Sequence, residues 1–200
     1  MFFIRLLSII LTASTAMAAM NTTGDLTRLR AIGLPSETSI YVFTSVECPH
    51  CADFHQNILP EIVKKYAKSG RAQILLVDSA SSSSPDATKA SMLARCLPAD
   101  KSEKFMAHVF NHQSEWVRQK DATEKLTRYA VTAGLTQNEA QKCLSDFNLK
   151  SAISDQWNNL AKLYHVLYLP TVAVRRGNIV RTYTGANKDA VLNGMEHDFQ

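Results

Sequence analysis

The strongest constraint on the fold is a pair of cysteines that stands where a strand pattern changes into a helix pattern. Residues 38–45, TSIYVFTS, form a compact run of β-branched and aromatic residues, which predicts a buried strand. The motif CPHC follows at residues 48–51, and apolar residues then recur at helical spacing until Gly70 ends the pattern. Pro60 lies inside that helix and predicts a kink, because its ring clashes with the preceding turn. A Cys-x-x-Cys at such a junction can bind a metal, form a structural disulfide or exchange disulfides.

The position of the motif favours a reactive thiolate at Cys48. The N-terminus of a helix presents unpaired backbone N–H groups and the positive end of the macrodipole, which lower the pKa of a thiol below its ordinary value of about 8.5. Pro49 fits the first helical position, where its missing N–H has no partner to lose. His50 can stabilise the anion further by charge or by a hydrogen bond. Cys51 lies inside the first turn, so we expect Cys48 to attack and Cys51 to resolve.

A stabilised thiolate also sets the redox direction, because it stabilises the reduced protein and makes the disulfide a stronger oxidant. Each pKa unit is about 1.4 kcal/mol, which is about 30 mV for a two-electron couple. A pKa three units below that of a thioredoxin-like site would therefore raise the potential by about 90 mV. The site is predicted to give its disulfide away.

The rest of the chain predicts an α/β fold that is interrupted by helices. Short strands are expected within 26–33 and 71–79, and two strands joined at 176–178 form a predicted hairpin. Five helices are expected between them, near 87–96, 101–111, 121–133, 136–147 and 150–165, and a last one near 188–197. Gly134 ends one of these helices, and Thr136 with Glu139 forms a capping box for the next. Without the helical block, the order is a βαβ–ββα unit.

The N-terminal residues have the layout of a secretory signal peptide. Arg5 precedes an apolar run at 6–11, and small residues follow up to Ala18, where cleavage is expected. The alternative, a membrane-spanning helix, would need about 20 apolar residues. Export places the four cysteines where disulfides persist. The basic residues of this chain, with formal charge +4, are scattered, so we expect no nucleic-acid partner.

These features together resemble the DsbA family of periplasmic thiol:disulfide oxidoreductases. The resemblance rests on the signal peptide, CPHC, the kinked helix, the helical insertion and LPT at 169–171. It implies a thioredoxin fold with an inserted all-helical domain, and a cis peptide at Leu169-Pro170 facing the active site, where the Leu169 backbone pairs with substrate. The alternative is a proline that only opens the strand beginning at Thr171.

One position departs from the family pattern. Thioredoxin-fold enzymes often carry a buried acid six residues before the first cysteine, and Val42 stands there in this chain. Glu47 is the nearest acid in the sequence, and we expect it to be an exposed rim residue that points elsewhere. The group that takes the proton from Cys51 stays open, and water is sufficient.

The domain boundaries follow from this order. Residues 1–18 are the predicted signal peptide, and 19–85 are the first part of a thioredoxin-like domain. The helical insertion is predicted at 86–165. Residues 166–200 complete the thioredoxin-like domain and contain the cis-proline loop.

The second pair of cysteines is expected to be structural. If Cys48 and Cys51 pair with each other, Cys96 and Cys143 are natural partners, and closing a loop of nearly 50 residues removes denatured-state entropy worth about 4 kcal/mol. The alternative is two buried free thiols that behave as small apolar groups. Neither residue lies in a Cys-x-x-Cys, so we expect a stabilising bridge without a catalytic role.

The expected function is a periplasmic dithiol oxidase that donates the Cys48–Cys51 disulfide to reduced, unfolded exported polypeptides. No cofactor beyond that disulfide and no metal is expected, and the protein is expected to be a monomer. The resemblance implies a membrane partner of the DsbB type that reoxidises it.

Two alternatives stay open. One is a reductase or isomerase of the same fold. Isomerases of this fold are expected to be dimers with a separate N-terminal dimerisation domain, and the short stretch before Ser39 is expected to leave no room for one. The other is a copper- or zinc-binding module using Cys48, Cys51 and His55, which lacks an obvious fourth ligand. His108 and His112 also have a metal-pair spacing, but we expect them to be surface or packing residues.

Overall fold

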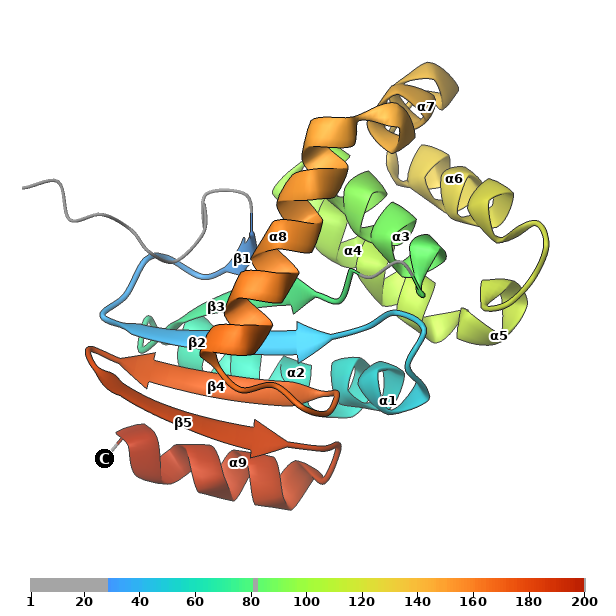
Figure 1. The fold of residues 1–200 in the computed structure, drawn as a ribbon. Helices are drawn as coiled ribbons and strands as arrows, with labels where there is room; N and C mark the ends of the chain where they lie inside the picture. Colours follow the sequence, from blue (N-terminus) through green and yellow to red (C-terminus); the bar gives the residue numbers. More distant parts are fainter. Residues whose placement is uncertain (1–28, 81–82, 200) are drawn as a thin grey trace, which may run out of the picture.

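The structure, a computed structural model, describes residues 29–80 and 83–199 (Figure 1). The predicted signal peptide at 1–18 lies outside this range. Within it, the strands form one mixed sheet in the order β1-β3-β2-β4-β5. Strands β2 and β3 are parallel, and the other neighbouring pairs are antiparallel. The strands are β1 (Arg30–Ile32), β2 (Thr38–Thr44), β3 (Gln73–Asp78), β4 (Thr171–Arg176) and β5 (Ile179–Thr184).

Helices cover both faces of this sheet and also form a separate group beside it (Figure 1). The α-helices are α1 (Pro49–Asn57), α2 (Leu59–Ile62), α3 (Pro85–Cys96), α4 (Ala99–Asn111), α5 (Gln113–Trp116), α6 (Ala122–Ala133), α7 (Gln137–Ser145), α8 (Phe147–Leu163) and α9 (Lys188–Glu196). A π-helical turn, η2 (Val63–Ala67), continues α2, and a 3-10 turn, η3 (His197–Phe199), follows α9.

The alternation of side chains along β2 explains why the sheet is covered on both faces. Ile40 and Val42 pack with the apolar residues of α1, α2 and α9 on one face. Tyr41 and Phe43 point to the other face, where they pack with Leu160 of α8 and the following Tyr164. The middle of the central strand, residues 40–43, is therefore apolar on both faces, as expected for a strand between two layers.

Helix α8 belongs to two parts of the molecule. Near its start, Leu149 and Ile153 pack with Met92 of α3 in the helical insertion. Near its end, Leu160 packs on the sheet. Figure 1 shows α8 reaching from the insertion across the sheet. The βαβ–ββα unit with an all-helical insertion is the predicted thioredoxin fold, and this helix joins its two parts.

The predicted kink at Pro60 is confirmed as a break between helices. Helix α1 ends at Asn57 and α2 begins at Leu59, with Ile58 at φ −114° between them. Proline has no N–H to donate to the carbonyl of Gln56, so the regular ladder cannot continue there. Gly70, at φ +73°, follows the end of the helical segment, as predicted.

The helices of the insertion agree with the sequence patterns except at α5. The capping box of Thr136 and Glu139 is present at the start of α7. Gly134 follows α6 in the left-handed region, with φ +119°. Helix α5 was not predicted, because four residues carry no helical period. Trp116 of α5 is fully buried in the core of the insertion.

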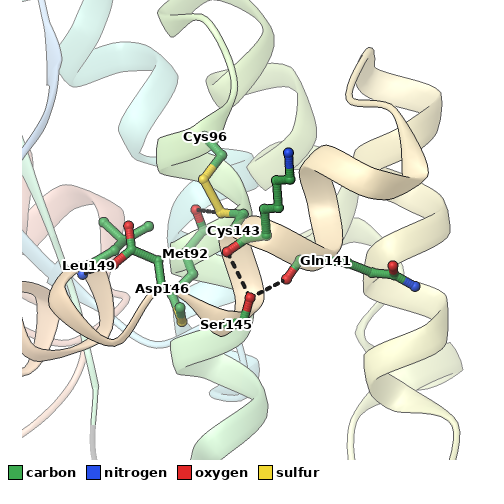
Figure 2. The surroundings of a disulfide bond; sticks show 8 residues. Met92, Cys96, Gln141, Cys143, Ser145, Asp146 and Leu149 are labelled. Carbon is green, nitrogen blue, oxygen red and sulfur yellow. Dashed lines mark hydrogen bonds between the residues drawn. A yellow bond between two sulfur atoms is a disulfide. The ribbon is translucent and has the colours of Figure 1, made fainter.

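The Cys96–Cys143 disulfide links α3 to α7, which confirms the predicted pairing. Figure 2 shows the bridge beside Met92, whose carbonyl oxygen lies 3.0 Å from Cys143 Sγ. The side chain of Gln141, two residues earlier, points away from the bridge (Figure 2). The disulfide lies inside the insertion.

Candidate active site

Cys48 is the N-cap residue of α1, and Pro49 is the first residue of the helix. The backbone N–H groups of Cys51 and Ala52 donate to the Cys48 carbonyl at 3.0 and 3.1 Å, which forms the first turn. No side chain caps this end of α1. The N–H groups of His50 and Cys51, at the positive end of the helix, therefore face an anion on the Cys48 sulfur.

The surroundings of Cys48 favour its thiolate. A hydrogen bond from the Cys51 thiol is the largest contribution and lowers the pKa of Cys48, and partial burial opposes it. The backbone N–H groups of Cys51 and His50 and the charge of His50 lower it further. Together they bring the pKa of Cys48 to about 6. The predicted direction is therefore reproduced, with the neighbouring thiol as the main donor.

Cys51 is chemically different from its neighbour. It is fully buried, and the N–H of Ser45 donates to its sulfur at 3.4 Å. The hydrogen bond to Cys48 and then burial raise the pKa of Cys51 above its ordinary value. Cys48 is only half-buried, while Pro49 and His50 are exposed. An incoming thiol can thus reach Cys48 and not Cys51, as the sequence predicts.

The loop before β4 brings Leu169 and Pro170 to the cysteines. The peptide between them is cis, as the resemblance implied. The Leu169 carbonyl oxygen lies 4.0 Å from Cys48 Sγ. Pro170 is buried, and its carbonyl accepts from the N–H of Gly185 at 2.8 Å. The backbone of Leu169 is therefore held beside the sulfur, although 121 residues separate the two in the sequence.

The same loop exposes two large apolar side chains. Leu167 and Tyr168 are 82% and 71% exposed, and they directly precede Leu169. Exposed apolar residues beside a reactive group are typical of a binding surface. Leu167 and Tyr168 therefore place apolar surface next to the cis-proline.

No acid stands at the position six residues before Cys48. Val42 is fully buried on β2, between Leu76 of β3 and Val172 of β4. A histidine, His55, lies four residues after Cys51 on α1. Burial and the charge of Arg30 lower the pKa of His55 to about 3, so the ring is neutral over the physiological range.

His55 is engaged away from the cysteine pair. Its Nε2 lies 3.2 Å from the Thr44 hydroxyl, and its ring stacks on Phe110 with centroids 3.8 Å apart. In residues 29–80 and 83–199, no group of three or more His, Cys, Asp or Glu side chains is arranged to hold a metal. The described geometry therefore does not assemble the Cys48, Cys51 and His55 clamp.

The expectation that Glu47 is an exposed rim residue was wrong, although its side chain does point away from the cysteines. Glu47 is half-buried, and its carboxylate accepts a hydrogen bond from the N–H of Ala87 at 2.9 Å, at the start of α3. The side chain thus points into the interface with the insertion. The first turn of α3 has no cap from its own flanking residues, so its free N–H groups attract the carboxylate.

Gln113 is a residue near the site that sequence reasoning missed. Its side-chain amide nitrogen lies 2.6 Å from the Val46 carbonyl oxygen and 3.0 Å from that of Cys48. The 65 residues between Gln113 and Cys48 leave no local signal. A glutamine between two predicted helices gives no reason to expect anything but an exposed surface residue.

The paired histidines lie apart from this site, on the insertion. The rings of His108 and His112 have centroids 3.9 Å apart, and His112 Nδ1 lies 2.9 Å from the His108 carbonyl oxygen. Tyr129 packs edge-on against His108. These contacts fit the expectation of packing residues.

The helices of residues 29–80 and 83–199 lack the combination of length and hydropathy that crossing a bilayer requires. The strands of the sheet and helix α1 come from two stretches of the chain, 30–78 and 171–184, which pack against each other (Figure 1).

Comparison with known proteins agrees with this geometry. A Rickettsia bellii protein, provisionally named a protein-disulfide oxidoreductase, is 28% identical over 141 residues, which are 70% of this chain and 53% of that protein. A Rickettsia prowazekii protein with the same provisional name is 26% identical, with 70% and 51% covered. The chain thus spans about half the length of the curated relatives it matches.

Solved structures share the fold. Wolbachia pipientis alpha-DsbA1 matches with a TM-score of 0.75 at 19% identity, covering 88% of this chain and 92% of that one. Oxidised BdbD from Bacillus subtilis matches with a TM-score of 0.72 at 15% identity, covering 88% and 96%. The family model described as Thioredoxin matches residues 30–189, which include CPHC and the cis-proline. The chain therefore belongs to the thioredoxin family.

Proposed function

We propose that the protein is an exported thiol:disulfide oxidoreductase of the DsbA type that donates the Cys48–Cys51 disulfide to reduced polypeptides. The observation that carries this proposal is the placement of the half-buried Cys48 sulfur at the start of α1, where the Cys51 thiol and two N–H groups stabilise its anion. The provisional names of the Rickettsia relatives support the same reaction class.

The reaction is two thiol–disulfide exchanges. A substrate thiolate attacks Cys48 Sγ of the disulfide, forms a mixed disulfide with it and releases Cys51 as a thiolate, which takes up a proton. A second substrate thiolate attacks the substrate sulfur of the mixed disulfide and releases the Cys48 thiolate. The substrate loses two electrons and two protons and gains a disulfide, and the protein becomes the dithiol. The redox-active disulfide is the only redox group this reaction needs.

The cis-proline loop is proposed to hold the substrate. The Leu169 backbone beside Cys48 can pair with an extended chain, and Pro170 fixes its direction. The exposed Leu167 and Tyr168 offer apolar contact to unfolded chains of varied sequence. We further propose a periplasmic location, a monomer, and reoxidation by a membrane partner of the DsbB type.

Oxidation is preferred over reduction because of the direction of the Cys48 shift. A stabilised Cys48 thiolate stabilises the reduced protein, which makes the Cys48–Cys51 disulfide the stronger oxidant. A disulfide isomerase or reductase is the second candidate, since the same dithiol chemistry serves both.

Redox equilibration with glutathione tests the proposal, followed by oxidation of reduced ribonuclease, reactivation of scrambled ribonuclease and reduction of insulin. We expect a potential more oxidising than thioredoxin's, of about −270 mV, and oxidation of ribonuclease that disappears in Cys48→Ala. Faster reactivation of scrambled ribonuclease than oxidation of reduced ribonuclease would favour the isomerase. Absence of all three activities would refute the enzyme.

Zinc and copper content of the reduced protein addresses the metal-binding alternative. A near-stoichiometric metal that is lost in Cys51→Ser would revive it. Because the His55 ring is occupied by Thr44 and Phe110, we expect no such metal.

A further inference from the structure

The loop that carries Cys48 is attached to the helical insertion by two side chains. Glu47 of the loop accepts from the N–H of Ala87 in α3. Gln113 of α5 donates in the opposite direction, to the carbonyl oxygens of Val46 and Cys48. Both attachments join the thioredoxin-like part of the molecule to the insertion, and they hold Cys48 and the two residues before it.

The orientation of the Gln113 side-chain amide follows from the groups that it contacts. Both partners are backbone carbonyl oxygens, which can only accept, so the amide must turn its NH₂ group toward them. One amide nitrogen with two hydrogens thereby satisfies two acceptors, at 2.6 and 3.0 Å. A side chain that lacks an NH₂ group cannot make this pair of bonds.

Gln113 is itself held in place. It is the first residue of α5, and Trp116 of the same turn is fully buried and donates from Nε1 to the Val109 carbonyl oxygen at 3.0 Å. Lys125 of α6 donates to the Glu115 carbonyl oxygen at 2.6 Å. A short helix with these attachments is a fixed part of the insertion, so its amide presents a defined position to the loop.

The loop also packs into the same core. Val46, Cys51 and Ala52 belong to one apolar cluster with Phe110 and Trp116. The insertion therefore supports the active site from behind by apolar contact and orients its backbone by the Gln113 bonds. Apolar contact alone is non-directional, whereas the Gln113 bond adds to those from the Cys51 and Ala52 N–H groups in fixing the direction of the Cys48 carbonyl.

The chemistry of the contact bears on the sulfur. The carbonyl oxygens of Val46 and Cys48 belong to the backbone that carries the sulfur, and both bear partial negative charge. Hydrogen bonds from the Gln113 NH₂ group offset that charge. Together with the N–H groups of Cys51 and Ala52, they hold the Cys48–Pro49 peptide plane, from which the Cys48 side chain projects. A change at Gln113 should therefore reach Cys48 without any contact with substrate.

We propose that Gln113 is a positioning residue through which the helical insertion holds the Cys48 backbone and tunes the stability of its sulfur anion. The inference deepens the proposed function. It rests on that function only in taking disulfide donation as the reaction in which the Cys48 sulfur takes part. It assigns the insertion a part in the redox chemistry besides covering the site.

Two variants separate the parts of this proposal. Gln113→Met keeps the length of the side chain and removes the donors, whereas Gln113→Glu keeps the shape and places a carboxylate against two carbonyl oxygens. Gln141→Met and Gln141→Glu, on the exposed face of α7, are the matched controls. Far-UV circular dichroism and thermal melting check that each variant is folded.

The measurement is the pKa of Cys48 in the reduced proteins, from thiolate absorbance at 240 nm against pH, together with the glutathione equilibrium constant. We expect the pKa to rise by about half a unit in Gln113→Met and by about one unit in Gln113→Glu. The equilibrium constant for reduction of the protein by glutathione should fall about threefold and about tenfold, the latter being about 30 mV. The Gln141 variants should match the wild-type protein.

Each outcome decides one question. Variants that melt at a lower temperature but keep the wild-type pKa would show a merely structural contact and overturn the proposal for Gln113. A wild-type Cys48 with an ordinary pKa would overturn the proposed oxidase instead. If both Gln113 variants failed to fold, Gln113→Ala, which adds neither charge nor bulk, would be compared with the wild-type protein, and an unchanged pKa there would again overturn the proposal.

Discussion

At the scale of single residues, Cys48 and Cys51 differ in burial and in pKa because they occupy different positions at the start of one helix. Cys48 occupies the N-cap position of α1 and is half-buried, whereas Cys51, in the first turn, is fully buried. The same hydrogen bond between them lowers the pKa of one and raises that of the other. A donor favours the anion it faces and disfavours its own ionisation.

The stability of the reduced protein should therefore depend on pH through Cys48. Its folded pKa of about 6 lies below the unfolded value of about 8.5, so its contribution is fully present above about pH 8.5 and is lost as pH falls through 6. Because Cys48 is partly exposed and screened, we expect about 1–2 kcal/mol rather than the full shift. Urea unfolding under reductant at pH 5.5 and 8.5 measures it.

Cys48→Ala is the control for this experiment, since it removes the group and leaves Cys51. Its free energy of unfolding should change less between the two pH values than that of the wild-type protein. Equal changes in both proteins would contradict the assignment. The raised pKa of Cys51 affects the free energy of unfolding mainly above the ordinary thiol pKa of about 8.5, and therefore contributes little between pH 5.5 and 8.5.

At the scale of elements, α3 is capped by a residue from another part of the chain. Ser84, its N-cap residue, makes no side-chain capping bond, and Glu47 accepts from the N–H of Ala87 instead. The carboxylate also faces the positive end of the helix. This contact joins the active-site loop to the insertion by helix-capping chemistry.

Replacing Glu47 by Ala should lower the free energy of unfolding by about 1 kcal/mol, because the cap is lost. Glu47→Gln keeps an acceptor oxygen and should lose about half as much. Urea unfolding of the oxidised proteins at pH 7 measures both. A Glu47→Ala protein as stable as the wild type would show that water replaces the cap.

The disulfide between α3 and α7 makes a second prediction at this scale. Cys96→Ala combined with Cys143→Ala opens a loop of 47 residues and should reduce the free energy of unfolding by up to about 4 kcal/mol. Because the bridge lies in the insertion and away from Cys48, oxidation of reduced ribonuclease should be retained. Thermal melting and that assay separate the two effects, and a folded but inactive variant would contradict the structural role.

At the scale of the whole molecule, a buried charge cluster joins the sheet to the insertion. Arg30 of β1 donates to Asp78 of β3 at 2.7 and 3.2 Å and to Glu103 of α4 at 2.7 Å. Arg95 of α3 lies 3.9 Å from the same Asp78 carboxylate. Four elements from both parts of the molecule are thus linked through Arg30 and Asp78.

Asp78→Asn should destabilise the protein by about 3 kcal/mol, because it leaves buried arginine charge without its partner. Burial alone would raise the pKa of Asp78, but the charge and hydrogen bonds of Arg30 and the charge of Arg95 outweigh it and hold the pKa below its ordinary value. This stabilisation is present above about pH 4 and is lost as pH falls further. Acid unfolding monitored by circular dichroism measures both.

Asp155→Asn, on the exposed face of α8, is the matched control and should change stability by less than about 0.5 kcal/mol. An Asp78→Asn protein with the stability of this control would contradict the prediction. Equal midpoints of acid unfolding in Asp78→Asn and the wild-type protein would show that other carboxylates govern the acid limit.

Local patterns predicted much of this molecule because they act over a few residues. The β-branched run before Cys48, the clash of the Pro60 ring and the capping box at Thr136 each depend on neighbours in the chain. The predicted strands, the break between α1 and α2 and the start of α7 were confirmed for that reason. Helix α5 escaped prediction since a single turn has no period to detect.

The sequence by itself determined which cysteine stands at the start of the helix and which lies inside its first turn, because the spacing of CPHC at a strand-to-helix junction is a local property. The resemblance that CPHC and LPT carry implied the cis-proline. Only the tertiary structure decided what surrounds that sulfur. Glu47 turns toward α3, and Gln113 reaches the Cys48 carbonyl from 65 residues away. Such contacts depend on how separate elements pack, and a single side chain that bridges them leaves no periodic signal in the chain.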